Sequence, residues 1–189
     1  VTTFNLDEYL GLSKDNEQSY HYFMQNHLFD HVNVKPRRIH IPNGNTENVD
    51  DECNFYDQLI AKSNGIDIQV LGIGNNAHIG FNEPQISFEK GTHVVELDDS
   101  TREANARFFE TLDEVPKQAI TMGTGTILKS RKIMLLASGR AKAKAIYDTV
   151  HGHVSPEVPS SILQFHPDTV LILDEEAASL LSEKDYKHL

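Results

Sequence analysis

Short runs of strand-forming residues alternate with helical patterns along this chain, and this alternation limits the possible folds more than any other feature. Strand signals, rich in β-branched and other apolar residues, occupy Val1–Asn5, Arg38–Ile41, Ile66–Gly72, His93–Leu97, Ala119–Met122, Lys132–Ala137 and Thr169–Leu173. Helical patterns lie between them at Gln18–Phe29, Val49–Ser63, Ser100–Phe109, Gly125–Lys129, Arg140–His151 and Ser160–Phe165. The alternation predicts an α/β chain with a three-layer, Rossmann-like fold and a mostly parallel central sheet.

Three of the strand runs, at 68–71, 133–136 and 170–173, are almost wholly apolar. Such runs are typical of strands that are buried on both faces, as in a parallel sheet. The chain contains no repeat of fixed period and no low-complexity segment. We therefore expect residues 1–189 to form a single α/β domain.

Two helix starts carry capping signals. Asp50 or Asp51 is a candidate cap for the helix that begins near Val49, and Ser100 is a candidate for the helix that follows it in the predicted order.

The acidic balance of the chain excludes several classes of partner. Asp and Glu number 28 against 17 Lys and Arg, so the formal net charge is −11. This charge argues against a non-specific nucleic-acid binder and against binding to an anionic membrane, although a few local cations can still hold a small anion. The longest apolar runs are far shorter than the roughly 20 residues that a bilayer-spanning helix needs. We expect no nucleic acid and no membrane among the partners.

The single cysteine, Cys53, excludes an internal disulfide and a cysteine-cluster metal site. It lies in a helical pattern, and we expect an inert thiol in a reducing compartment. Val1 opens directly on strand-like residues, with no secretory signal pattern before it. We therefore expect a cytoplasmic protein and expect that sequence upstream of Val1 is missing.

Ligands of such folds bind beyond the carboxyl ends of the strands, so the loops to examine follow Asn5, Gly72, Leu97 and Ala137. Asp7 and Glu8 stand together just after the first of these strands. Neighbouring carboxylates repel each other, which raises a pKa and suits a general base. A solvated turn before a helix is the alternative explanation of the pair.

The segment Gly72–Pro84 begins where a buried strand ends and brings Asn76, His78 and Glu83 within eight positions. Imidazole can accept and return a proton near neutral pH, and a neighbouring carboxylate or amide can fix its tautomer. A polar loop that satisfies its own backbone is the alternative. Ala77 stands where a dinucleotide-binding loop has its third glycine, so the segment does not match that fingerprint.

Candidate phosphate ligands are Arg107, in the helix that starts near Ser100, and Lys142, in the first turns of the next helix but one. A helix N-terminus with a nearby lysine favours an anion, and arginine can bind phosphate through two hydrogen bonds. Ordinary solvated charges are the alternative, and that explanation fits Arg102, Arg140 and Lys144 better.

Together these motifs closely resemble the glucosamine-6-phosphate deaminase family. The resemblance runs from Val1 to about Asp174 and rests on Val1–Tyr9, Gly74–Pro84, Thr101–Phe109, Val115–Gly123 and Leu163–Pro167. Its most specific part is the run His-Ile-Gly-Phe-Asn-Glu-Pro, residues 78–84, which separates this family from the 6-phosphogluconolactonases of the same fold.

The resemblance implies conversion of glucosamine 6-phosphate and water to fructose 6-phosphate and ammonia. Asp7 matches the base that moves a proton between C2 and C1 of the open-chain sugar, and His78 matches the residue that opens the pyranose ring. Asn76 and Glu83 match the partners that orient His78. Arg107 and Lys142 match residues that bind the substrate phosphate. No cofactor and no metal are expected.

The chain departs from the family pattern in three places. The family begins earlier, with a strand and a Gly/Thr-rich phosphate loop, so we expect impaired folding and little activity from a molecule that truly begins at Val1. Asn76 stands where many members have Asp, which leaves an imidazolium less stabilised. Ala77 replaces the usual glycine, and a positive φ there would impose a strain of about 1 kcal/mol.

Hexameric, allosteric members of the family place basic residues on the strand after the Glu-Pro turn, where this chain reads Thr92-His93-Val94-Val95-Glu96. We therefore expect no allosteric effector site, and the choice between monomer and homo-oligomer stays open. Two other functions remain as alternatives: a non-catalytic sugar-phosphate-binding module and a 6-phosphogluconolactonase.

Overall fold

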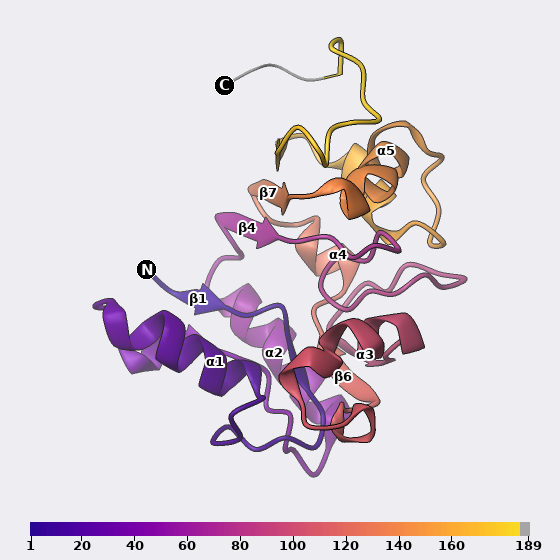
Figure 1. Cartoon of the computed structure of the whole chain (residues 1–189). Coiled ribbons are helices and arrows are strands. Elements are labelled where there is room, and N and C mark those ends of the chain that lie inside the picture. Colours follow the sequence, from indigo (N-terminus) through magenta and orange to yellow (C-terminus); the bar gives the residue numbers. More distant parts are fainter. Residues whose placement is uncertain (186–189) are drawn as a thin grey trace. The chain divides into compact units, whose positions relative to one another are not determined.

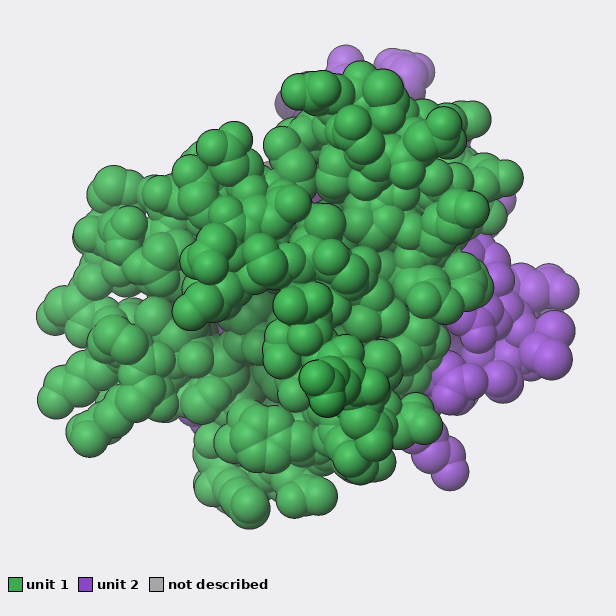
Figure 2. Space-filling model, turned by 90° about the horizontal axis from the view of Figure 1, so that it is seen from below, with its two compact units in different colours: residues 1–64, 91–123 green, residues 65–90, 124–189 purple. Residues whose placement is uncertain are grey.

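The computed structural model describes residues 1–185. The chain divides into two compact units, which Figure 2 shows in different colours. Unit 1 comprises residues 1–64 and 91–123, and unit 2 comprises residues 65–90 and 124–189. No helix in the described part of the chain is both long enough and apolar enough to cross a membrane. The expectation of a single domain over 1–189 stays a prediction.

Unit 1 contains two small sheets. Its strands are β1 (Thr3–Phe4), β2 (Asp7–Tyr9), β3 (Ile39–His40), β5 (His93–Glu96) and β6 (Gln118–Thr121). β1 pairs in parallel with β3, whereas β6 lies between β2 and β5 and is antiparallel to both. In this register Asp7 lies opposite Thr121 and Tyr9 lies opposite Ala119.

The helices of unit 1 begin at side-chain caps. They are α1 (Tyr20–His27), α2 (Val49–Lys62) and α3 (Asp99–Asn105). Ser19 accepts a hydrogen bond from the backbone N–H of Tyr22 and so caps α1. Asn48 caps α2 and Asp98 caps α3, so the caps that the sequence suggested are wrong. Each true cap stands shortly before the acidic or hydroxyl residue that we had favoured, because those residues already belong to the first turn.

Tyr56 of α2 joins the helix to the two-stranded sheet. Its side chain is buried, and its hydroxyl lies 2.7 Å from the carbonyl oxygen of Asn5 and 3.1 Å from that of His40. These carbonyls directly follow β1 and end β3. Phe4 packs edge-on against the Tyr56 ring and stacks on His40. The backbone that leads from β1 to β2 is thus fixed from within the core.

Unit 2 contains a parallel sheet in the order β4 (Ile68–Leu71), β7 (Lys132–Ala137) and β8 (Thr169–Leu173). Figure 1 shows β4 and β7 side by side. Its helices are α4 (Thr124–Ile127) and α5 (Ala143–His151), and a 3₁₀ helix covers Pro159–Phe165. The core is formed by fully buried aliphatic side chains of these elements, including Ile127, Ile133, Leu135 and Ile146.

The three strands of the parallel sheet are not buried on both faces, contrary to the expectation from their apolar runs. Ile68 and Val70 of β4 are 54% and 55% exposed, and Leu136 and Val170 are exposed as well. Leu71, Ile133 and Leu135 point to the other face and are buried. Apolar composition alone therefore did not distinguish a strand covered on one face from a strand covered on both.

The α/β fold class with parallel sheets is confirmed, and all seven expected strands are present. The sequence analysis missed β2 and the antiparallel arrangement around β6. A short 3₁₀ helix covers Leu112–Glu114, in a stretch for which the sequence predicted neither helix nor strand. Cys53 is buried in α2 as a free thiol, and burial raises its pKa to about 11, so the expectation of an inert thiol is supported.

Candidate active site

Asp7 is the first residue of β2, and its position is set by backbone pairing with β6. The backbone bonds continue on both sides of the strand, where Met122 donates to the carbonyl of Leu6 and Leu10 donates to that of Gln118. Burial, and then the negative charge of Glu8, raises the pKa of Asp7 to about 7. A carboxyl with this pKa can accept and release a proton near neutral pH, as a general base must.

Glu8 points into the protein and caps the N-terminal end of α1. One carboxylate oxygen accepts hydrogen bonds from the backbone N–H groups of Tyr9 and Tyr20, each at 2.9 Å, and the other accepts from His21 at 2.8 Å. Burial raises the pKa of Glu8, and these three bonds oppose that rise. The side chain is 2% exposed. The pair is therefore not a solvated turn, since one carboxylate is an internal anchor and the other lies beside it.

Gly44 packs tightly against the backbone that follows Asp7. A Cβ atom at this glycine would lie 2.0 Å from the carbonyl oxygen of Tyr9, so no side chain fits here. The N–H of Gly11 also donates to the carbonyl of Gly44. The segment around Gly44 thus helps to fix β2, a function that the sequence did not signal.

The loop after β4 folds back on itself between Gly74 and His78. The N–H of Gly74 donates to the carbonyl of His78 at 2.9 Å, and the N–H of Ala77 donates to the carbonyl of Gly74 at 3.1 Å. Ala77 has φ = +67°, so the positive φ considered in the sequence analysis is present and is borne by a residue with a Cβ atom. Ser160 donates its N–H to the carbonyl of Ala77 at 3.0 Å and holds this strained residue in place.

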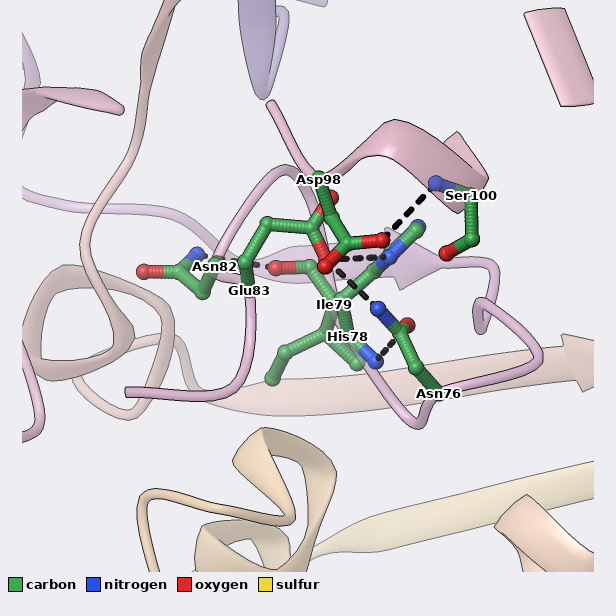
Figure 3. A network of polar contacts seen from close by, with 7 residues as sticks. All are labelled: Asn76, His78, Ile79, Asn82, Glu83, Asp98 and Ser100. Carbon is green, nitrogen blue, oxygen red and sulfur yellow. Dashed lines mark hydrogen bonds and ion pairs between the residues drawn. The ribbon is translucent and has the colours of Figure 1, made fainter. Parts of the chain in front are cut away.

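Three of the sequence-predicted site residues, Asn76, His78 and Glu83, meet in this loop. Figure 3 shows the carboxylate of Glu83 between the imidazole of His78 and the amide of Asn76. The Oε2 atom of Glu83 lies 3.2 Å from Nδ1 of His78 and accepts a hydrogen bond from Nδ2 of Asn76 at 2.7 Å. Asn76 Oδ1 also accepts from the backbone N–H of His78 at 3.3 Å.

This trio places a carboxylate on one edge of the imidazole in a mostly buried setting. The side chain of Glu83 is 6% exposed and that of His78 is 19% exposed. With Nδ1 directed at Glu83, the nitrogen that remains for an outside group is Nε2. The Asn76 amide nitrogen binds the carboxylate and not the ring, so Asn76 acts on the imidazole through Glu83 and on the His78 backbone directly.

Asn82 is a residue whose function in the loop was not singled out from sequence. Its side-chain amide donates to the carbonyl of Ile79 at 2.8 Å, and its backbone N–H donates to the same carbonyl at 3.1 Å. Gly80, with φ = +57°, lies inside this tight turn. An Asn shortly after a Gly is the composition of such turns, and that signal was available in the printed sequence.

The two predicted phosphate ligands lie on different elements. Arg107 is exposed in the 3₁₀ helix Ala106–Phe108 of unit 1, and its guanidinium lies over the ring of Phe108, 4.7 Å from the centroid. Lys142 is half-buried in unit 2, where it ends the 3₁₀ turn Arg140–Lys142 and directly precedes α5. Asp7 belongs to unit 1, and the Asn76–His78–Glu83 trio belongs to unit 2.

The parallel sheet and the carboxylate-supported imidazole at the end of one of its strands define an α/β protein equipped for proton transfer. Residues 1–172 match the model of one family, described as glucosamine-6-phosphate isomerases/6-phosphogluconolactonase. The chain belongs to this family. A glucosamine-6-phosphate deaminase of Clostridium botulinum (strain Alaska E43 / Type E3) is 66% identical over 187 residues, which cover 99% of this chain and 75% of that protein.

Two solved structures share the fold of this chain. The structure of a monomeric glucosamine-6-phosphate deaminase superposes with a TM-score of 0.92 at 51% identity and covers 95% of this chain and 74% of that one. A 6-phosphogluconolactonase from Thermotoga maritima superposes with a TM-score of 0.72 at 15% identity and covers 91% of this chain and 72% of that one. The second likeness shows the shared fold alone.

Proposed function

We propose that this protein is a glucosamine-6-phosphate deaminase that converts glucosamine 6-phosphate and water to fructose 6-phosphate and ammonia. The observation that carries the proposal is the hydrogen-bonded Asn76–His78–Glu83 trio, of which His78 and Glu83 lie in the sequence run 78–84 that distinguishes the deaminases. The deaminase of C. botulinum, similar to this chain over nearly all of its length, supports the same conclusion. We further propose a cytoplasmic location, in keeping with a small phosphorylated substrate.

His78 opens the pyranose ring in this proposal. A neutral ring that donates its Nδ1 proton to Glu83 carries a free electron pair on Nε2. Nε2 takes the proton of the C1 hydroxyl and delivers it to the ring oxygen as the C1–O5 bond breaks. The product is the open-chain aldehyde, and His78 returns to its starting form. Glu83 stabilises the imidazolium that exists between the two transfers.

Asp7 moves the carbon-bound proton. Its carboxylate removes the proton from C2 of the open-chain sugar while O1 takes a proton from water, which gives an enolamine. The carboxyl then returns its proton to C1, and the nitrogen gives a proton back to the hydroxide. The resulting imine at C2 takes up water and releases ammonia, which leaves a ketone at C2. A pKa of about 7 suits both halves of this transfer, because the group is neither a very weak base nor a very weak acid at neutral pH.

Arg107 and Lys142 bind the substrate phosphate in this proposal. Arg107 is exposed, with its guanidinium over the face of Phe108, and Lys142 directly precedes α5, where helix N–H groups favour an anion. Arg107→Ala should raise KM for the sugar phosphate by about tenfold or more, the equivalent of a lost charged hydrogen bond, and should change kcat little. An unchanged KM would remove Arg107 from the phosphate site.

We propose that the protein lacks an effector site on β5. Nδ1 of His93 in this strand donates a hydrogen bond to the carbonyl of Gly91, and Glu96 accepts one from Gln118. A histidine and a glutamate thus occupy the stretch where allosteric relatives carry basic side chains. Rate curves should be hyperbolic with and without N-acetylglucosamine 6-phosphate, and a sigmoidal curve that this compound abolishes would contradict the proposal.

Ammonia release from glucosamine 6-phosphate tests the proposed function directly. Purified protein should release ammonia and fructose 6-phosphate in equal amounts. Faster hydrolysis of 6-phosphogluconolactone than deamination would favour the lactonase alternative. Binding of the sugar phosphate with no turnover would favour the non-catalytic module.

A further inference from the structure

The loop of the trio contains a glycine whose missing side chain makes room for the imidazole. A Cβ atom at Gly74 would lie 2.4 Å from Cε1, 2.5 Å from Nδ1 and 2.6 Å from Nε2 of His78. Real Cβ contacts are essentially never shorter than 3.0 Å, so no other residue fits at this position with the ring where it is. The three ring atoms are nearly equidistant, which means that Gly74 faces the flat of the ring and not its edge.

The need for glycine here is one of space and not of backbone conformation. Gly74 is not among the residues with a positive φ, whereas Ala77, in the same loop, is. Its backbone is also fully engaged, because its N–H donates to the carbonyl of His78 and its carbonyl accepts from the N–H of Ala77. The backbones of Gly74 and His78 are therefore joined in one closed loop, with the imidazole ring against the glycine.

We propose that Gly74 is a positioning residue for His78. Gly74 supports the face of the imidazole ring, and Glu83 fixes the edge that carries Nδ1, so that only Nε2 remains for proton transfer. Contact with the face limits rotation of the ring, and the carboxylate selects the tautomer with the proton on Nδ1. The effect on catalytic rate rests on the proposed function, whereas the effect on the ring does not.

Gly74→Ala tests the proposal, with Gly72→Ala as its matched control. Gly72 lies in the same loop, and no atom of the described residues outside its chain neighbours lies within 4 Å of a Cβ placed there. Gly74→Ala should lower kcat by about 100-fold, the usual cost of displacing a reacting group by an ångström, and should leave KM within about threefold. Gly72→Ala should keep kcat within about twofold of wild type.

The tautomer of His78 distinguishes the two explanations. It would not change in Gly74→Ala if Gly74 served only the stability of the backbone. In ¹⁵N-detected imidazole spectra, assigned with a His78→Gln reference, wild type and Gly72→Ala should show one tautomer with the proton on Nδ1. Gly74→Ala should show a mixture of both tautomers, because the displaced ring leaves Glu83. A single Nδ1–H tautomer in Gly74→Ala together with near-normal kcat would overturn the proposal.

A double-variant cycle covers the case in which Gly74→Ala is too unstable for kinetics. Alanine at position 74 should lower Tm when His78 is present and should cause little further loss in the His78→Ala background, where the ring is gone. Equal losses in both backgrounds would mean that Gly74 serves the backbone alone, and would refute the proposal. The Tm and tautomer measurements do not require enzymatic activity. A protein without deaminase activity would refute the proposed function, but these two measurements would still test the proposal for Gly74.

Discussion

Asp7 lies on a strand whereas His78 lies in an irregular loop, and the two segments are stabilised in different ways. The strand is fixed by backbone pairing with β6 and by a neighbouring carboxylate that caps α1. The loop has a few backbone hydrogen bonds of its own and depends in addition on side chains: a carboxylate, an amide and a glycine that leaves room for a ring. Backbone pairing tolerates many side chains, but the loop depends on particular ones. Substitutions near Asp7 should therefore act mostly on its charge, whereas those near His78 should act on geometry.

Removing the carboxylate of Asp7 should have the largest effect. Asp7→Asn keeps the size of the side chain and the strand pairing but removes the proton acceptor, so kcat should fall about 10²- to 10⁴-fold. Binding of the sugar phosphate should change little, because the asparagine occupies the same space. Steady-state kinetics and a binding titration measure the two effects. Asp15→Asn, at an exposed position, is the control.

Near-normal turnover of Asp7→Asn would show that another group is the base. In that case β2 would carry no catalytic residue, and only the loop with His78 would remain part of the proposed active site.

Removing the negative charge from the loop should have a smaller effect on rate, because Glu83 acts through His78. Glu83→Gln places a second amide beside Asn76 and weakens the orientation of the ring, so kcat should fall roughly 100-fold. Glu89→Gln, in the same unit but outside the trio, should stay close to wild type. Equal rates for the two variants would contradict the view that side chains fix the loop.

The pH dependence of stability should reveal the buried charge on the strand. Since the pKa of Asp7 is raised to about 7, the folded protein holds a proton that the unfolded chain releases near pH 4. The associated stability is present at low pH and is lost as the pH rises through about 7. Asparagine does not titrate, so Asp7→Asn does not lose this stability as the pH rises. Its free energy of unfolding relative to wild type should be higher at pH 8 than at pH 5 by on the order of 2 kcal/mol.

Urea denaturation of both proteins at the two pH values measures this difference. An offset that does not change with pH would mean that Asp7 titrates in the folded protein as it does in the unfolded chain.

Relief of backbone strain in the loop should have the smallest effect. Ala77→Gly removes the positive-φ penalty of about 1 kcal/mol and gains part of it as stability, since the greater freedom of glycine in the unfolded chain offsets the rest. Ala145→Gly in the helix α5 should instead lose about 1 kcal/mol or more. Opposite signs for the two substitutions, measured by thermal unfolding, would confirm that the loop is strained at Ala77.

The sequence predicted the fold well where one physical signal dominated. Runs of β-branched and aliphatic residues located β4, β7 and β8 because such residues are enriched in strands of any environment. β2 was missed because two carboxylates in succession are typical of a turn, and only pairing with the distant β6 makes them a strand. The cap of α2 was misplaced because Asn48, Asp50 and Asp51 all carry suitable side chains, and the first turn decides between them.

For the candidate site, the residue types and the loop were predictable, but their contacts were not. The spacing of Asn76, His78 and Glu83 indicated a supported imidazole, and the three do meet. That the amide binds Glu83 and not the ring depends on how the turn through Gly80 returns the chain. The sequence also did not indicate that the group approaching Gly74 is the protein's own imidazole.

The division of the chain between its units has a consequence for its synthesis. Unit 1 comprises residues 1–64 and 91–123. The chain therefore leaves this unit after residue 64, and its second part completes the unit only after residues 65–90. The partner of Asp7 across the antiparallel ladder is Thr121, and β2 thus has no strand to pair with until the ribosome has released that part of the chain. Asp7 therefore reaches its place in the ladder only after residue 121 has been made, whereas Glu8 needs only Tyr20 and His21, close by in the sequence, to cap α1.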